Sequence, residues 1–274
     1  MTPLHDAHNH LQDSRLADWR ARAFASYAEN VDGRAVVNGT CETDWEQVAE
    51  LAETHGWIHP SFGLHPWRLA GRSPQWMEQL GTWLDRFPAA AVGEIGLDRW
   101  MDDPDIDAQL ECFQKQMRRA AADNRAATVH CLKAIGLLEE TTRDLPLPKR
   151  GWLLHSYNGP PEMVPQWVER GAYFSISPYF AHERKSKQLD TFRAVPRERL
   201  LIETDAPSMW PPDEANPHPL TTAEGEPINH PANLEVSFRL AMQVTGWTET
   251  EAREQLAENF HRLFGADSHT QTEG

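Results

Sequence analysis

The stretch Asp6-Ala7-His8-Asn9-His10 lies at the end of the first apolar run of the chain, and it distinguishes between two folds that alternating strands and helices commonly form. An open, doubly wound sheet predicts a glycine-rich phosphate-binding turn after its first strand. This stretch instead contains two histidines and no glycine. The end of the first strand therefore favours a closed (β/α)8 barrel over the open sheet.

Outward from this stretch, short apolar or β-branched runs alternate with segments of helical periodicity. The other seven runs are 35–39, 57–63, 90–96, 126–131, 151–155, 172–177 and 200–205. Between them, apolar residues recur at three-and-four spacing, which predicts helices such as 44–52 and 109–122. Eight strands joined by right-handed crossovers close a barrel. We therefore predict the α/β class and a single TIM-type (β/α)8 barrel.

The limits of this barrel follow from the two ends of the pattern. Residues 1–265 are predicted to form one domain, which closing helices near 232–245 and 248–264 complete. The proline-rich stretch 211–231 has little periodicity and is predicted to be an ordered loop over one barrel end. The polar residues 266–274 are predicted to be a disordered tail.

The composition restricts the compartment and the partners of the protein. None of the 274 residues falls in an apolar run near the roughly 18 residues of a membrane span, and the start of the chain does not resemble a signal peptide. We therefore expect a cytoplasmic protein with no membrane partner and no obligate protein partner. The formal net charge of −15 argues against non-specific coating of nucleic acid, but it leaves open a small phosphate-bearing substrate.

Histidines and acids collect at the predicted carboxyl ends of the strands, where barrel enzymes carry their chemistry. These residues are His8, His10, Glu94, His130, His155 and Asp205. His8 and His10 are two apart, so both imidazoles can face the same side of a strand. A single histidine is more often structural, but structural residues have no reason to collect at five strand ends. Imidazole and carboxylate ligands suit a Zn, Mn, Fe or Ni ion, so we predict a divalent metal centre.

Several ordered motifs also run through nearly the whole chain. They are Asp6-Ala7-His8-Asn9-His10, Gly63-Leu64-His65-Pro66-Trp67, Gly93-Glu94-Ile95-Gly96-Leu97-Asp98, Val129-His130, Leu154-His155-Ser156-Tyr157-Asn158-Gly159, Leu201-Ile202-Glu203-Thr204-Asp205-Ala206-Pro207 and Glu258-Asn259-Phe260-His261-Arg262-Leu263-Phe264. Together they make the sequence resemble the TatD family of metal-dependent hydrolases and deoxyribonucleases, within the amidohydrolase-like superfamily. The resemblance implies the same barrel fold and the same metal-binding role for the strand-end residues.

The resemblance further implies two divalent ions, which we expect to be Zn, Mn or Mg. Their implied ligands are His8, His10 and Asp205 on one ion, His130 and His155 on the other, and Glu94 as the bridge between them. One departure concerns the substrate. The family usually has an arginine two positions after the fifth-strand histidine, where this chain has Leu132 followed by Lys133. Lys133 is a candidate to replace part of that contact as a point charge.

Three residues are predicted to act in catalysis, because a metal centre of this kind activates water for hydrolysis. Asp205 is expected to bind metal and to orient or deprotonate the water, while Glu94 holds the two ions together. His65 is expected to hydrogen-bond the scissile group or its leaving oxygen. A structural role for His65 in the turn before Pro66 fits the sequence equally well.

The predicted substrate contacts are His65, Lys133, Arg184 and Lys185. Arg184 and Lys185 belong to the basic cluster that follows the seventh strand, where barrel enzymes often bind phosphate. A solvated helix start is the alternative for this cluster. Trp67, Trp100 and Trp210 each follow a strand and present aromatic faces on which a base could stack, although ordinary packing explains at least some of the tryptophans.

Three functions are compatible with these patterns. The leading hypothesis is a metal-dependent phosphodiesterase or deoxyribonuclease that acts on DNA ends or short single strands. The second is hydrolysis of an amide or ester bond in a small molecule, which the acidic charge and the missing arginine favour. The third, a non-catalytic metal-binding scaffold, predicts the loss of one or more ligands, whereas this sequence retains all six.

Overall fold

The computed structural model describes residues 2–30 and 33–265, so the tail predicted for 266–274 lies outside the described residues. Eight parallel strands pair in chain order, each with its neighbours in sequence. Their bounds are β1 (Asp6–Asn9), β2 (Ala35–Asn38), β3 (Ile58–Phe62), β4 (Ala91–Asp98), β5 (Ala127–Leu132), β6 (Trp152–Leu154), β7 (Ala172–Ile176) and β8 (Leu200–Ile202). The predicted eight-stranded architecture is therefore confirmed.

The barrel closes where the chain leaves its first and last strands. The backbone N–H of Asp205 donates to the carbonyl of His8 at 2.9 Å, and the N–H of His10 donates to the carbonyl of Ala206 at 2.7 Å. These two bonds lie at the carboxyl ends of β1 and β8. These two hydrogen bonds therefore hold the backbones of His8, His10 and Asp205, three of the predicted ligands, close together.

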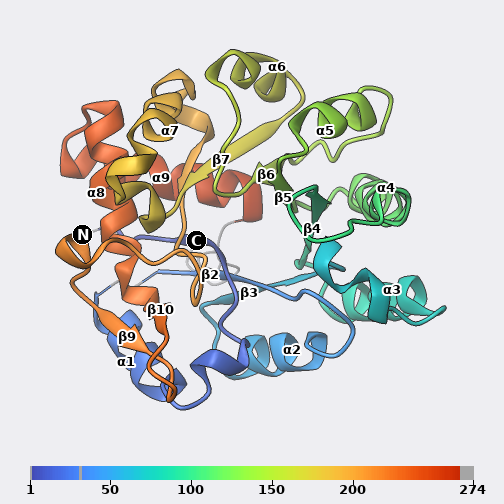
Figure 1. The fold of residues 1–274 in the computed structure, drawn as a ribbon, viewed down its shortest axis with the longest axis horizontal. Helices are drawn as coiled ribbons and strands as arrows, with labels where there is room; N and C mark the ends of the chain where they lie inside the picture. The colour runs from blue at the N-terminus through green and yellow to red at the C-terminus, as the bar shows by residue number, and fades with distance from the viewer. Residues whose placement is uncertain (1, 31–32, 266–274) are drawn as a thin grey trace, which may run out of the picture.

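Helices surround the strands in chain order, as Figure 1 shows. Their bounds are α1 (Arg20–Asn30), α2 (Trp45–Thr54), α3 (Trp76–Arg86), α4 (Ile106–Ala122), α5 (Ile135–Thr142), α6 (Val164–Glu169), α7 (Ser186–Thr191), α8 (Leu234–Thr245) and α9 (Glu249–Phe264). Capping side chains fix the start of the last helix, because Thr248 and Glu251 form a reciprocal capping box.

Helix α9 closes the amino-terminal end of the barrel. Its Phe260 and Phe264 pack against small residues of the strands, including Ala7 and Ala91, in a cluster separate from the main core. The main core lies between the strands and the surrounding helices. Because aromatic side chains fill one end of the barrel, the polar strand ends at the other end are left to form a site.

The loop 211–231 differs from the prediction, because it contains an antiparallel hairpin of β9 (Pro219–Thr221) and β10 (Pro227–Asn229). Three-residue strands beside prolines carry no alternating pattern, so the sequence did not indicate them. The Asn229 side chain donates to the carbonyl of Thr204 at 2.8 Å. This bond ties the loop to the carboxyl end of β8.

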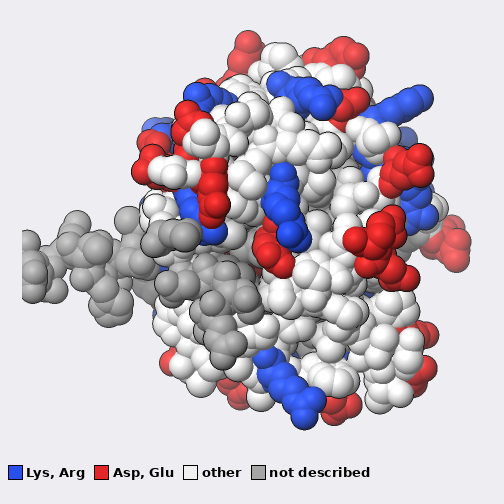
Figure 2. Space-filling model, turned by 90° about the vertical axis from the view of Figure 1, so that its left-hand side faces the viewer, with Lys and Arg blue, Asp and Glu red and all other residues white. Residues whose placement is uncertain are grey.

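Figure 2 shows acidic and basic side chains interspersed on one face of the molecule. None of the helices within residues 2–30 and 33–265 combines the length and the apolar character needed to cross a membrane.

Candidate metal centre

The six predicted ligands come together at the carboxyl end of the barrel. They are His8 on β1, His10 just after it, Glu94 on β4, His130 on β5, His155 after β6 and Asp205 after β8. Glu94 lies at the centre of this cluster and is 3% exposed. The Glu94 carboxylate therefore lies within reach of the other predicted ligands.

The two carboxylate oxygens of Glu94 face different histidines. Oε2 lies 3.4 Å from Nε2 of His8 and 3.1 Å from Nε2 of His10. Oε1 lies 2.9 Å from Nε2 of His155 and 3.4 Å from Nδ1 of His130. The cluster thus consists of two sets of nitrogens that share one carboxylate.

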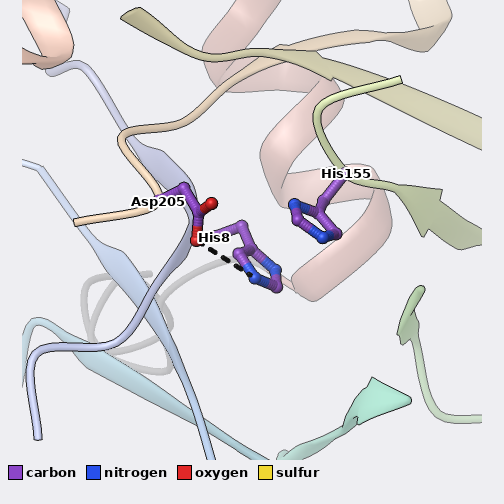
Figure 3. Close-up of side chains that lie close together, drawn as sticks. All are labelled: His8, His155 and Asp205. Carbon is purple, nitrogen blue, oxygen red and sulfur yellow. Dashed lines mark ion pairs between the residues drawn. The ribbon is translucent and has the colours of Figure 1, made fainter. Parts of the chain in front are cut away.

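Asp205 belongs to the set around His8 and His10. Its Oδ1 lies 3.5 Å from Nε2 of His10 and 3.9 Å from Nε2 of His8. Figure 3 shows Asp205 and His8 facing each other, with the ring of His155 beside them. Ligand atoms within 4.8 Å of one another include the groups His8–His155–Asp205 and His8–His10–Glu94.

Hydrogen bonds on the far side of two rings indicate which nitrogen faces the cluster without a proton. Nδ1 of His10 lies 2.8 Å from the carbonyl oxygen of Asn38, and Nε2 of His130 lies 2.8 Å from Oδ2 of Asp98. Because these oxygens are acceptors, the outer nitrogens carry a proton in the neutral ring. The inner nitrogens then direct a lone pair at Glu94. This is the tautomer of a metal-ligating histidine.

The burial of His8 also supports a role in metal binding. The side chain is fully buried, yet neither ring nitrogen has a hydrogen-bond partner among the described residues. Its ring stacks on that of His155, with centroids 4.0 Å apart and an interplanar angle of 7°. Because buried polar atoms normally have partners, the orphaned Nε2, which faces Glu94 and Asp205, fits an atom whose partner is a metal ion.

The electrostatics of the cluster favour bound positive charge. Burial lowers the pKa of His10 and His155, but the nearby carboxylates outweigh burial and raise both pKa values well above the ordinary range. Burial raises the pKa of Glu94, but His65, His155 and His8 outweigh it and hold this pKa well below its ordinary value. A group of carboxylates that stabilises protonated imidazoles also attracts divalent cations.

His65 lies in the same cluster but has the opposite tautomer. Its Nδ1 accepts a hydrogen bond from the backbone N–H of Trp67 at 3.2 Å, so the proton of the neutral ring is on Nε2. That Nε2 lies 3.3 Å from Oε1 of Glu94. Burial is the main reason that the pKa of His65 falls to about 4, which keeps the ring neutral. His65, Glu94 and His130 also form a group whose ligand atoms lie within 4.8 Å of one another, but this tautomer arranges His65 as a hydrogen-bond donor.

Buried carboxylates support the ligands from behind. Oδ2 of Asp98 accepts from His130 and also from the indole N–H of Trp67, at 2.7 Å. Glu203 is fully buried and accepts from Ser156 at 2.5 Å. Nδ1 of His155 lies 3.5 Å from Oε1 of Glu203, although the geometry does not satisfy a hydrogen bond. Both acids fix groups near the cluster.

The local backbone of β4 places Glu94. The pairing of β4 with β5 shifts by one residue between Val92 and Ile95, around the position of Glu94. Such an irregularity re-aims a side chain. At Gly93 a Cβ would lie 1.8 Å from Oγ1 of Thr128, so only glycine allows β4 to approach β5 this closely. The Gly-Glu motif is thus required by packing as well as by chemistry.

A cleft of about 820 Å³ leads to the cluster. His10, His65 and Glu94 line it, together with residues of the loops after β1 and β2 such as Arg15 and Cys41. Sequence reasoning did not single out these two residues. Their position in loops that follow strand ends is the signal that could have identified them.

The predicted substrate contacts divide between two places. His65 lines the cleft, whereas Lys133, Arg184 and Lys185 do not. Arg184 donates to the hydroxyl of Tyr179 at 2.7 Å, and the ammonium of Lys185 lies 5.3 Å from the centre of the same ring. Burial lowers the pKa of Lys185, with contributions from the charges of Arg184 and Lys133. These three cations therefore form a separate basic group at the exits of β5 and β7.

The sequence profile of the family described as TatD related DNase matches residues 5–265. The chain belongs to this family. Among its curated relatives, the uncharacterized metal-dependent hydrolase YjjV of Escherichia coli K12 is 28% identical, over 94% of this chain and 96% of the relative. The 3′-5′ ssDNA/RNA exonuclease TatD of Citrobacter koseri is 32% identical, over 73% of this chain and 75% of the relative.

Solved structures agree with the sequence comparisons. The crystal structure of YjjV, a TatD homologue from Escherichia coli K12, has a TM-score of 0.83 at 27% identity, over 96% of this chain and 98% of that one. A TatD-family hydrolase from Entamoeba histolytica has a TM-score of 0.81 at 16% identity, over 97% and 99% of the two chains, which shows the shared fold. This member of the TatD family is a metal-dependent hydrolase.

Proposed function

We propose that this TatD-family hydrolase is a two-metal phosphodiesterase that acts on the ends of DNA or on short single strands. The observation that carries the proposal is the division of Glu94, whose two oxygens face two separate sets of histidines. The proposed ligands are His8, His10 and Asp205 for one ion, His130 and His155 for the other, and Glu94 for both. The proposed ions are Zn, Mn or Mg, because oxygen and imidazole ligands suit these metals.

Two bound cations would supply Lewis acidity that activates water and stabilises charge on the attacking and leaving oxygens. The protein residues have the task of orientation and proton transfer. Asp205 is 7% exposed, and its pKa, which burial raises, is lowered overall by His10 and the other histidines. An ionised carboxylate in this position can hold the attacking water and accept its proton.

His65 has the complementary role in this proposal. Its Nε2–H faces Oε1 of Glu94 in the lining of the cleft, and the backbone bond to its Nδ1 holds that tautomer in place. A neutral N–H donor stabilises negative charge that develops on a phosphoryl or leaving oxygen. His65 is thus proposed as a catalytic hydrogen-bond donor that leaves metal binding to the other histidines.

Single-stranded nucleic acid is the proposed substrate class because relatives of this chain are named 3′-5′ ssDNA/RNA exonuclease. The basic group of Lys133, Arg184 and Lys185, which lies at the exits of β5 and β7 and outside the cleft, also supports the proposal. These cations offer phosphate contacts at a second location, beyond the reacting bond. The short reach of such a cluster fits a strand end or a short strand better than a wrapped duplex.

A substrate panel tests this proposal. Purified protein with known metal content is incubated with labelled single-stranded DNA, bis-p-nitrophenyl phosphate and N-acyl amino acids, in parallel with Glu94→Ala. We expect cleavage of the two phosphodiesters, no cleavage of the amides, and loss of activity in the variant. Cleavage of amides with intact phosphodiesters would refute the nuclease proposal. Full activity of Glu94→Ala would refute the proposed bridge.

A further inference from the structure

Trp67 is exposed in a way that packing does not explain. It lies in the 3-10 helix η2 (Pro66–Gly71), two residues after His65, and lines the cleft that leads to Glu94. Its side chain is 58% exposed. Nevertheless, its indole N–H donates to the buried carboxylate of Asp98 at 2.7 Å. A large aromatic face is thus held in one orientation while most of it remains open to solvent.

The same carboxylate oxygen fixes the ring relative to the metal centre. Oδ2 of Asp98 accepts from Trp67 and from Nε2 of His130, a proposed ligand, at 2.8 Å. The indole stands edge-on to both neighbouring imidazoles, with centroids 5.0 Å from His65 and 5.8 Å from His130. Asp98 therefore sets the distance between the open aromatic face and the reacting centre.

We infer that Trp67 is a stacking platform for a nucleobase of the substrate next to the scissile bond. The inference rests on the proposed phosphodiesterase function and adds recognition of the base. Stacking on an indole accepts any base, because every base has an aromatic face. A ring that is already immobile loses little conformational entropy when a ligand binds. Asp98 thus acts as a positioning residue, because it holds both the proposed metal ligand His130 and the proposed platform Trp67.

Trp100 provides a matched control. It is 69% exposed and its backbone N–H also bonds to Asp98, but its side chain does not line the cleft. A general effect of removing an exposed indole near Asp98 would appear equally in Trp100→Ala. An effect of the platform would appear only in Trp67→Ala.

The test compares binding of two dye-labelled phosphorothioate oligomers, one of oligothymidylate and one abasic at every position, by fluorescence anisotropy. We expect the wild type and Trp100→Ala to bind the thymidylate oligomer roughly tenfold or more tighter than the abasic one. Trp67→Ala is expected to bind both equally, and Trp67→Phe to retain part of the preference. Metal content is measured for each variant, because equal content excludes an indirect effect through His130.

Binding and hydrolysis separate the two claims. Equal affinity of the wild type for both oligomers, or a preference that survives in Trp67→Ala, would overturn the platform. A base-dependent preference that disappears in Trp67→Ala and survives in Trp100→Ala supports it. If that preference is present but ordinary phosphodiester oligomers remain intact, the platform stands and the proposed hydrolytic function is wrong.

Discussion

His10 and His65 both direct a ring nitrogen at Glu94, but their outer nitrogens have different partners. The outer nitrogen of His10 faces a carbonyl, whereas that of His65 accepts from a backbone N–H. Since each neutral ring carries one proton, His10 offers a lone pair to the cluster and His65 offers a donor. The sequence predicted His10 as a metal ligand and left two roles open for His65, but it could not predict the tautomers, because that of His10 depends on a residue as distant in the chain as Asn38.

Removal of the donor should reduce turnover and spare the metal. For His65→Ala we expect kcat to fall by about 10²- to 10³-fold, as for loss of one transition-state donor. Metal content should equal that of the wild type, and His65→Gln should recover part of the rate through its amide N–H. His155→Ala is the contrasting variant, since it should lose metal. Loss of metal from His65→Ala would contradict the assigned tautomer.

Asp98 should control metal affinity without touching the metal. Asp98→Asn replaces the carboxylate that accepts from His130 and weakens the preference for the ligating tautomer. We expect metal affinity to fall by about 10- to 100-fold, measured by competition with a chelator. Asp85→Asn changes an exposed carboxylate in α3 that pairs with Arg119, and it serves as the control. Equal affinities in the two variants would exclude the support role.

Among the structural elements, the eight strands of the barrel were predicted from the sequence. Their apolar runs and strand-end histidines placed all eight, because parallel strands buried on both faces are continuous hydrophobic stretches. The hairpin of β9 and β10 was not predicted, since Pro219 and Pro227 interrupt any alternation. The extra residue in β4 beside Glu94 was also not predicted, because it depends on how Gly93 packs against Thr128 of β5.

A methyl group added at Gly93 should destabilise the fold more than a methyl group added at a glycine with open space around it. In Gly93→Ala the new Cβ would meet the side chains of Thr128 and Ser61, so the strands must move apart. We expect the free energy of unfolding to fall by about 1–3 kcal/mol. We also expect metal to bind more weakly. Gly136→Ala, where no atom lies within 4 Å of the new Cβ, should have no such cost. Chemical denaturation and metal analysis of both variants test this difference.

For the molecule as a whole, the barrel separates stability from chemistry. Phe260 and Phe264 of α9 fill its amino-terminal end, while the ligands occupy its carboxyl end. His59 lies in β3 near the aromatic end, where its ring is 5.6 Å from that of Phe264. The sequence indicated the barrel, but it did not predict a buried histidine close to the aromatic residues at its amino-terminal end.

This buried histidine makes stability depend on pH. Burial is the main cause that lowers the pKa of His59 to about 3. Below its ordinary pKa of about 6.5 the unfolded chain takes up a proton that the folded chain does not, so stability falls as pH decreases from 6.5 towards 3. Between about pH 7 and pH 5 we expect a loss of roughly 1–2 kcal/mol from His59. His59→Gln should therefore show a smaller loss in denaturant titrations, and an equal loss would contradict the assignment.

In the proposed metal centre, two ions share Glu94. The most direct measurement of this sharing is the number of metal ions per chain, determined by elemental analysis of the wild type and of Glu94→Gln after identical metal loading. We predict two ions in the wild type and a loss of at least one in the variant, while His65→Gln retains both. A single ion in the wild type, or two ions retained in Glu94→Gln, would contradict this prediction.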